Sequence, residues 1–100
     1  MVMGREGTLV KAKNFEQITV DDTAGGKGLT SSEYTGSLFA KVQVETAEIR
    51  YTEDGTAPTT TVGHIGSVYD IIYVSFQDFA TFKAIRTGTT SGKLNITYFK

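Results

Sequence analysis

One short stretch holds several of the residue types that could carry out chemistry. Residues 50–64, RYTEDGTAPTTTVGH, contain the only histidine and the only proline of the chain together with an Asp-Gly pair. The carboxylate of Asp54 is a candidate ligand for a sugar or a calcium ion, although the spacing of an EF-hand is absent. His64 is a candidate catalytic base or metal ligand.

His64 lacks the partners that such chemistry needs. The chain contains no second histidine and no cysteine, so the usual zinc ligand set is missing. Ser67 and Asp70 are close in sequence, so counting alone does not exclude a Ser-His-Asp triad, yet no nucleophile-elbow pattern surrounds any serine. We expect a loop carbonyl to satisfy His64, and we predict no enzyme activity, no catalytic residue, no cofactor and no metal.

Asp54, Gly55 and Pro58 favour a structural turn. An Asp-Gly pair after an alternating strand is a strong hairpin signal, because both residues tolerate the positive φ of a tight turn. Pro58 cannot donate a hydrogen bond to a neighbouring strand, so the returning segment should be an edge or a loop. The stretch 50–64 is therefore predicted to form a rigid corner.

The glycine-rich stretch 24–30, AGGKGLT, is a candidate phosphate-binding loop. Gly28, however, stands where such a loop needs Ser or Thr after its lysine, and no helix pattern follows. A flexible turn is the better interpretation.

Five aromatic residues in the second half of the chain are a candidate stacking platform for bases or sugars. No basic groove accompanies them, so we expect them to pack in the core. They are Tyr69, Tyr73, Phe76, Phe79 and Phe82.

The elements that position these residues are predicted to be strands. Residues 40–45 and 93–99 alternate between apolar and polar positions, which is typical of a strand with one buried side. Residues 47–52 alternate in the opposite phase, and we interpret 40–52 as one long strand with a bulge near Glu45–Thr46 that bends the ribbon.

Three further strands are predicted. Residues 68–76 are apolar at both parities, as expected of a central strand covered on both faces, and 82–86 and 15–20 are shorter candidates. About six strands at this spacing predict an all-β fold, a single antiparallel β-sandwich or jelly-roll-like barrel over residues 15–100.

The composition limits the classes of partner. One hundred residues form one domain, and a net charge of −1 without a basic stripe argues against nucleic acid. No apolar segment is long enough for a membrane span or a signal peptide, and there is no cysteine. We expect synthesis in a reducing cytoplasm.

Residues 1–14 are predicted to be an N-terminal arm that becomes ordered on a partner. Apolar residues there stand among glycine and charged residues, as in segments that fold on binding. Deletion of residues 1–13 is expected to weaken attachment and to leave the β fold intact. The candidate contact residues are Val2, Met3, Leu9 and Val10.

The chain resembles small β proteins from the structural-gene clusters of tailed bacteriophages, most specifically in IRYTEDGTAPT, VGH and FKAIRTG. The resemblance covers roughly residues 15–100. It implies a virion protein on the capsid surface, made in the host cytoplasm. It further implies a decoration (cement) protein that bridges subunits of the major capsid protein, as a homo-oligomer for which we expect a trimer.

Two alternatives stay open. The resemblance also fits a tail or fibre accessory protein. The run YTEDGTAPT is similar to a strand-turn in fibronectin-like modules of chitin-degrading and other glycosidases, and a carbohydrate-binding module on the virion surface would present exposed aromatic residues in one patch.

Overall fold

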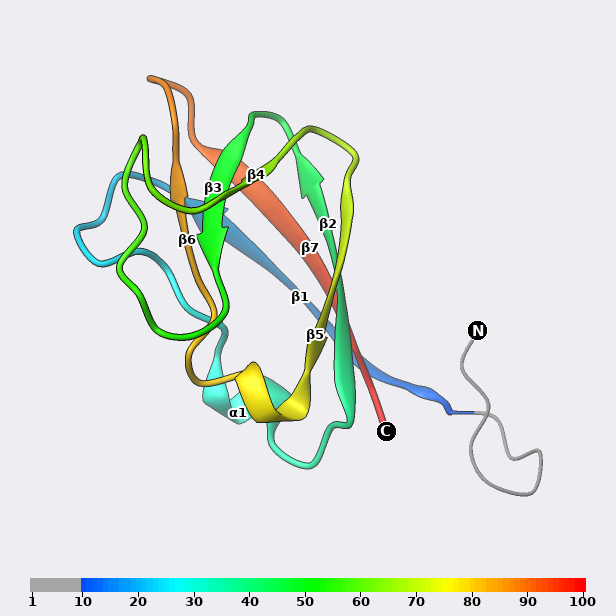
Figure 1. The fold of residues 1–100 in the computed structure, drawn as a ribbon. Coiled ribbons are helices and arrows are strands. Elements are labelled where there is room, and N and C mark those ends of the chain that lie inside the picture. Colours follow the sequence, from blue (N-terminus) through cyan, green and yellow to red (C-terminus); the bar gives the residue numbers. More distant parts are fainter. Residues whose placement is uncertain (1–9) are drawn as a thin grey trace.

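Two antiparallel sheets pack against each other in a computed structural model that describes residues 10–100 (Figure 1). The larger sheet has the strand order β1 (Ala12–Val20), β7 (Gly92–Phe99), β2 (Phe39–Glu45) and β5 (Ile71–Ser75). The smaller sheet has the order β4 (His64–Gly66), β3 (Ile49–Thr52) and β6 (Lys83–Arg86). Two short helices, α1 (Ser31–Tyr34) and η2 (Phe76–Asp78), lie in the connections. The predicted all-β sandwich is confirmed.

The core lies between the two sheets. In β2 and β7 every second side chain is buried, so the alternation predicted from the sequence holds over both strands. Side chains from the smaller sheet and from the segment before β6 close the other side. The fully buried members include Val42, Val44, Leu94, Ile96, Tyr98, Ile49, Phe82 and Ala84.

The chain changes sheets at Thr46. Its φ of 78° ends β2, and the backbone N–H of Ala47 donates to the carbonyl of Glu45 (3.0 Å). The bend predicted near Glu45–Thr46 is confirmed, but one continuous strand is wrong, because β3 pairs only within the smaller sheet. A residue in the left-handed region cannot continue the ladder.

The bend after Thr46 lies directly on β7. A Cβ placed on Gly92 would come within 2.8 Å of Ile49 Cγ2 and 2.9 Å of the Ala47 carbonyl oxygen. Only glycine fits at such a close approach of two backbones. The crossing therefore depends on the residue at position 92.

The prediction of a central strand over 68–76 is wrong. β5 is only residues 71–75, and it forms one edge of the larger sheet. Its side chains alternate, with Ile72 and Val74 buried and Ile71 and Tyr73 exposed. The segment is apolar at odd and even positions alike because the exposed side chains of β5 are apolar as well as the buried ones.

β1 begins earlier than predicted. The strand starts at Ala12, so residues 12–14, which were assigned to the arm, belong to the sheet. Lys11 extends the pairing, since its backbone N–H donates to the Lys100 carbonyl (3.3 Å) and its carbonyl accepts the Lys100 backbone N–H (2.9 Å). Among the candidate contact residues of the arm, Val10 is half-buried, and Val2, Met3 and Leu9 lie outside the described residues.

Candidate functional site

The Asp-Gly pair forms a local turn. The Asp54 carboxylate accepts the backbone N–H of Thr56 (3.0 Å), and this hydrogen bond lowers the pKa of Asp54 below its usual value. Gly55 has a φ of 91°, as the turn requires. The turn does not join two paired strands directly, because β3 ends at Thr52 and the strand that pairs with it, β4, begins only at His64.

Pro58 stiffens this long connection from inside. Its side chain is fully buried, and it lies in a loop, as predicted. A Cβ on Gly26 would lie 3.0 Å from Pro58 Cγ, so the glycine-rich stretch packs on the loop. Lys27 then pairs through its backbone with Ala84 of β6 (2.7 and 2.9 Å). A turn at residues 24–25 is confirmed, but the prediction that the stretch is flexible is wrong, because these contacts hold it in place.

His64 does not assemble with the nearby serine and aspartate. The Asp70 carboxylate accepts the backbone N–H of Ser67 (2.9 Å), which turns it toward its own loop. The His64 side chain is exposed, and its ring centre lies 5.5 Å from that of Tyr51. No carbonyl within residues 10–100 accepts a hydrogen bond from the His64 side chain, so the expected loop-carbonyl contact is not formed there.

An open hollow of about 510 Å³ lies on the corner. The Asp54 carboxylate at its edge already serves the turn, so we assign the hollow no reaction. It is lined by Thr52, Glu53, Asp54, Thr56, Val62, Gly63 and His64.

The candidate aromatic platform divides into two groups. Phe79 and Phe82 are buried, as expected of core residues. Tyr69, Tyr73 and Phe76 are exposed, so the prediction of core packing is wrong for these three. These three residues lie on β5 or just beyond its ends, and β5 is an edge strand of the larger sheet.

The structure brings Tyr73 together with three phenylalanines that the sequence analysis did not single out. Phe15, Phe39, Tyr73 and Phe99 lie on the outward side of the larger sheet, and we call this cluster the aromatic face. Phe39 and Phe99 are opposite each other and their rings stack (centroids 4.6 Å apart, 9° between planes). The ring of Tyr73 lies 6.2 Å from that of Phe39, and Phe15 and Tyr73 are 58% and 62% exposed.

The aromatic face occupies one end of the sheet. Toward the other end the outward side is polar, with Gln17 Nε2 donating to Asn95 Oδ1 (2.7 Å) and Asn95 Nδ2 donating to Glu45 Oε1 (2.8 Å). These amide and carboxylate groups bond one another across three strands, so the outward side of β1, β7 and β2 is polar there, while Ile71 keeps the β5 edge apolar.

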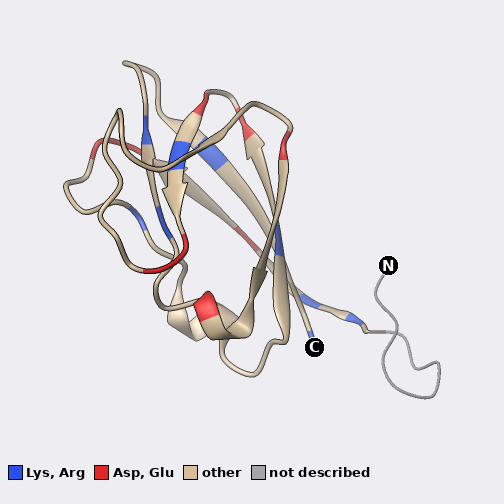
Figure 2. Ribbon diagram, in the orientation of Figure 1, with Lys and Arg blue, Asp and Glu red and all other residues tan. Residues whose placement is uncertain are grey.

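Lysines accompany the aromatic face. Lys41 is opposite both Thr97 and Tyr73, in the middle of the face. Lys11 and Lys100 flank its end, and Figure 2 shows basic residues where β1 begins, next to the C-terminal end. The outward positions of the two rows that carry the aromatic rings hold no acidic residue; they are Ala12, Phe15, Phe39, Lys41, Tyr73, Ser75, Thr97 and Phe99.

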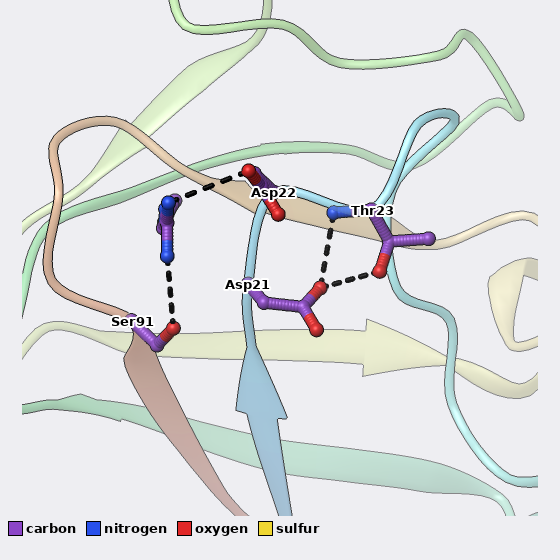
Figure 3. Close-up of polar contacts among 5 residues, drawn as sticks. Asp21, Asp22, Thr23 and Ser91 are labelled. Carbon is purple, nitrogen blue, oxygen red and sulfur yellow. Dashed lines mark hydrogen bonds and ion pairs between the residues drawn. The ribbon is translucent and has the colours of Figure 1, made fainter.

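An acidic pair after β1 has a structural role (Figure 3). Asp21 accepts hydrogen bonds from the hydroxyl (2.5 Å) and the backbone N–H (3.0 Å) of Thr23, and these bonds lower the pKa of Asp21. Asp22 pairs with the Arg86 guanidinium (3.4 Å), which also donates to Ser91. The pair ties the loop after β1 to β6. Across residues 10–100, no three His, Asp or Glu side chains converge on a common point.

A sequence signal for the missed residues exists. In 93–99 the polar face runs Lys93, Asn95, Thr97 and then Phe99, so an aromatic ring ends an otherwise polar series. Phe15 and Phe39 likewise stand on the polar parity of their strands. Aromatic residues at polar positions of three strands indicate a shared surface.

Comparisons of the chain with protein-family models, curated proteins and solved structures found no match. Over the part of the chain that the structure describes, no helix has the length and apolar character needed to cross a membrane.

Proposed function

We propose that the chain is a non-enzymatic virion structural protein of a tailed phage, which decorates the head and binds subunits of the major capsid protein through the aromatic face. The aromatic face is the observation that carries this proposal. Contiguous exposed apolar surface is typical of protein interaction sites. When many copies bind one shell, modest contacts at each copy are sufficient.

The residues of the face define the partner's chemistry. Half-buried Phe39 and Phe99 provide a rigid stacked base, while the more exposed Phe15 and Tyr73 offer anchors for a partner. Lys41 adds positive charge at the centre of this apolar surface. A complementary partner surface is apolar, with an acidic group opposite Lys41 and further acidic groups at the end near Lys11 and Lys100.

The aromatic face argues for a protein partner over a glycan. Stacking on a sugar needs a free ring face, whereas Phe39 and Phe99 cover one face of each other. A carbohydrate-binding module therefore stays the second candidate, supported only by Phe15 and Tyr73, and binding on a glycan array would favour it. A tail or fibre accessory protein would use the same face at another location.

Electron microscopy of virions labelled with antibody to this protein tests the location. Label over the head is the expected result. Label over the tail favours the accessory alternative, and absence of label from intact virions contradicts the virion proposal.

Two matched variants test the surface. Phe15→Asp places a charge on the aromatic face, and Val62→Asp places the same charge on the corner loop, where Val62 is also exposed (47%). Loss of an aromatic anchor costs at least about 2 kcal/mol, or roughly 30-fold in affinity. We expect this loss in co-sedimentation with particles for Phe15→Asp only. Equal binding by both variants would contradict a role for the aromatic face.

A further inference from the structure

Among the described residues, β5 is an uncovered edge of the larger sheet. Two backbone hydrogen bonds fix its orientation, because Val44 N–H donates to the Asp70 carbonyl (3.0 Å) and Phe76 N–H donates to the Leu38 carbonyl (3.0 Å). Hydrogen-bonded pairs alternate along an antiparallel ladder, so residues 72 and 74 face β2. The N–H and C=O groups of Ile71, Tyr73 and Ser75 therefore point away from the sheet.

The opposite edge of the larger sheet is covered. Lys13 Nζ on β1 donates to the carbonyls of Glu33 and Thr35 (3.1 and 2.8 Å). The Glu16 carboxylate accepts the hydroxyl of Thr30 (2.7 Å). The segment around α1 thus lies along β1.

The edges of the smaller sheet are also limited. The backbone of Lys27 pairs with Ala84 on β6, and β4 is only three residues long. Natural proteins protect edges by such coverings, by short strands and by charged residues. β5 has none of these devices within residues 10–100, since its sequence IIYVS has no charge, no proline and no glycine.

Exposed apolar side chains gather at this same edge. Among residues 10–100, four of the eight exposed large apolar side chains lie between residues 69 and 76, namely Tyr69, Ile71, Tyr73 and Phe76. Open backbone groups and apolar side chains on one strand together indicate that another strand binds there.

We propose that a second copy of this chain pairs antiparallel with β5, with the two-fold axis at Tyr73, so that a dimer replaces the trimer expected from the resemblance. Because residues 71, 73 and 75 all point outward, this register pairs Tyr73 with its own copy and Ile71 with Ser75, and it forms hydrogen bonds at each. Asp70 is then opposite Phe76 of the other copy, so no like charges face each other. The two larger sheets join, and both aromatic faces lie on one side of the dimer.

A second copy fits this edge because the edge is self-complementary. Because β5 carries no charged side chain, pairing with a second copy leaves no charge that would need an oppositely charged partner. The interface is small, and interfaces below about 1,200 Å² are weak or transient. Dimerisation should therefore depend on concentration. The pairing does not rest on the proposed virion role.

Disulfide trapping tests the register, because the full chain contains no cysteine. Residues in a hydrogen-bonded antiparallel pair have Cα atoms about 5.5 Å apart, which suits a disulfide. Tyr73→Cys should form a cross-linked dimer under mild oxidation. Ile71→Cys alone should not, but a mixture of Ile71→Cys and Ser75→Cys should. Cross-linking of Ile71→Cys alone, or none at position 73, would overturn the pairing.

Sedimentation of the full chain tests the pairing without cysteine. Tyr73→Pro removes an N–H group that points away from β2, so the fold tolerates it, whereas Tyr73→Ala keeps that group. We expect the proline variant to raise the dimer dissociation constant at least about tenfold more than the alanine variant. Ser75→Lys, which adds charge to the edge, provides a second variant if Tyr73→Pro fails to fold.

Four results would overturn the proposal. They are a monomer at all concentrations, a trimer, a dimer that Ser75→Lys leaves unchanged, and loss of the dimer on deletion of residues 1–9, which would assign the contact to the arm. Binding of the aromatic face to virions is measured separately, so either proposal fails alone.

Discussion

At the scale of single residues, the most constrained polar group is Tyr98. Its side chain is fully buried in the core, and its hydroxyl donates to the Glu16 carboxylate (2.5 Å). The ring also meets Phe79 edge-on, with centroids 5.8 Å apart. A buried hydroxyl needs such a partner, and here the partner is a half-buried carboxylate in the middle of β1.

Tyr98→Phe is expected to lower the free energy of unfolding by about 1.5–3 kcal/mol at neutral pH. A hydrogen bond to a charged group contributes about this much, and Thr30 still donates to Glu16. Urea denaturation measures the loss. Tyr51→Phe is the matched control, because the Tyr51 hydroxyl makes no such bond within residues 10–100. An equal loss in both variants would contradict the role of Glu16.

The same tyrosine gives a pH dependence. Burial, with the hydrogen bond to Glu16, raises the pKa of Tyr98 well above its usual value near 10. The folded state then favours the neutral phenol, so this contribution to stability is present below about pH 10 and is lost as the pH rises further. Tyr98→Phe should show a smaller loss of stability in this alkaline range.

At the scale of elements, the sequence predicted the strands with one clean buried face and the bend between β2 and β3. It could not predict the change of sheet at Thr46, because a β-branched residue with positive φ is held by its surroundings and not by its own preference. The alternation in 68–76 was hidden because Ile71 and Tyr73 are apolar and yet exposed. The aromatic face was missed because it combines four strands that are far apart in sequence.

Two substitutions at the bend between β2 and β3 should change the free energy of unfolding in opposite directions. Thr46→Gly removes the left-handed strain of a β-branched residue and should raise the free energy of unfolding by up to about 1 kcal/mol. Gly92→Ala forces a methyl group against Ile49 and the Ala47 carbonyl, and should lower it by about 1–3 kcal/mol. Thermal unfolding measures both. A destabilising Thr46→Gly would mean that the corner depends on the threonine side chain.

At the scale of the whole molecule, the sandwich has chemically different sides. The aromatic face and its lysines lie at the end where β1 begins, and the Asp21–Asp22 cluster lies where β1 ends. The corner between β3 and β4 is at the smaller sheet. Surfaces of distinct chemistry on one rigid body suit a protein that binds partners in a fixed orientation.

Truncation at the N-terminus separates attachment from folding. Deletion of residues 1–9 should leave the melting temperature unchanged and weaken particle attachment. Deletion of residues 1–13 should also lower stability, by about 1–3 kcal/mol, because it removes the Lys11 pairing with Lys100 and the Lys13 contacts to two carbonyls. Calorimetry and co-sedimentation measure the two effects. Unchanged attachment of both truncated chains would contradict the predicted arm.

The pairing of Lys11 with Lys100 also determines how the molecule responds to mechanical load. Because β1 and β7 are antiparallel neighbours, their outer ends meet at one end of the sheet. A pulling force between these ends would open the ladder one hydrogen bond at a time, like a zipper, since the bonds lie perpendicular to the strands. Force applied through a face of the larger sheet is instead shared by the whole sandwich. A protein held by that face would therefore withstand tension that would separate β1 from β7 if the protein were held by their two outer ends.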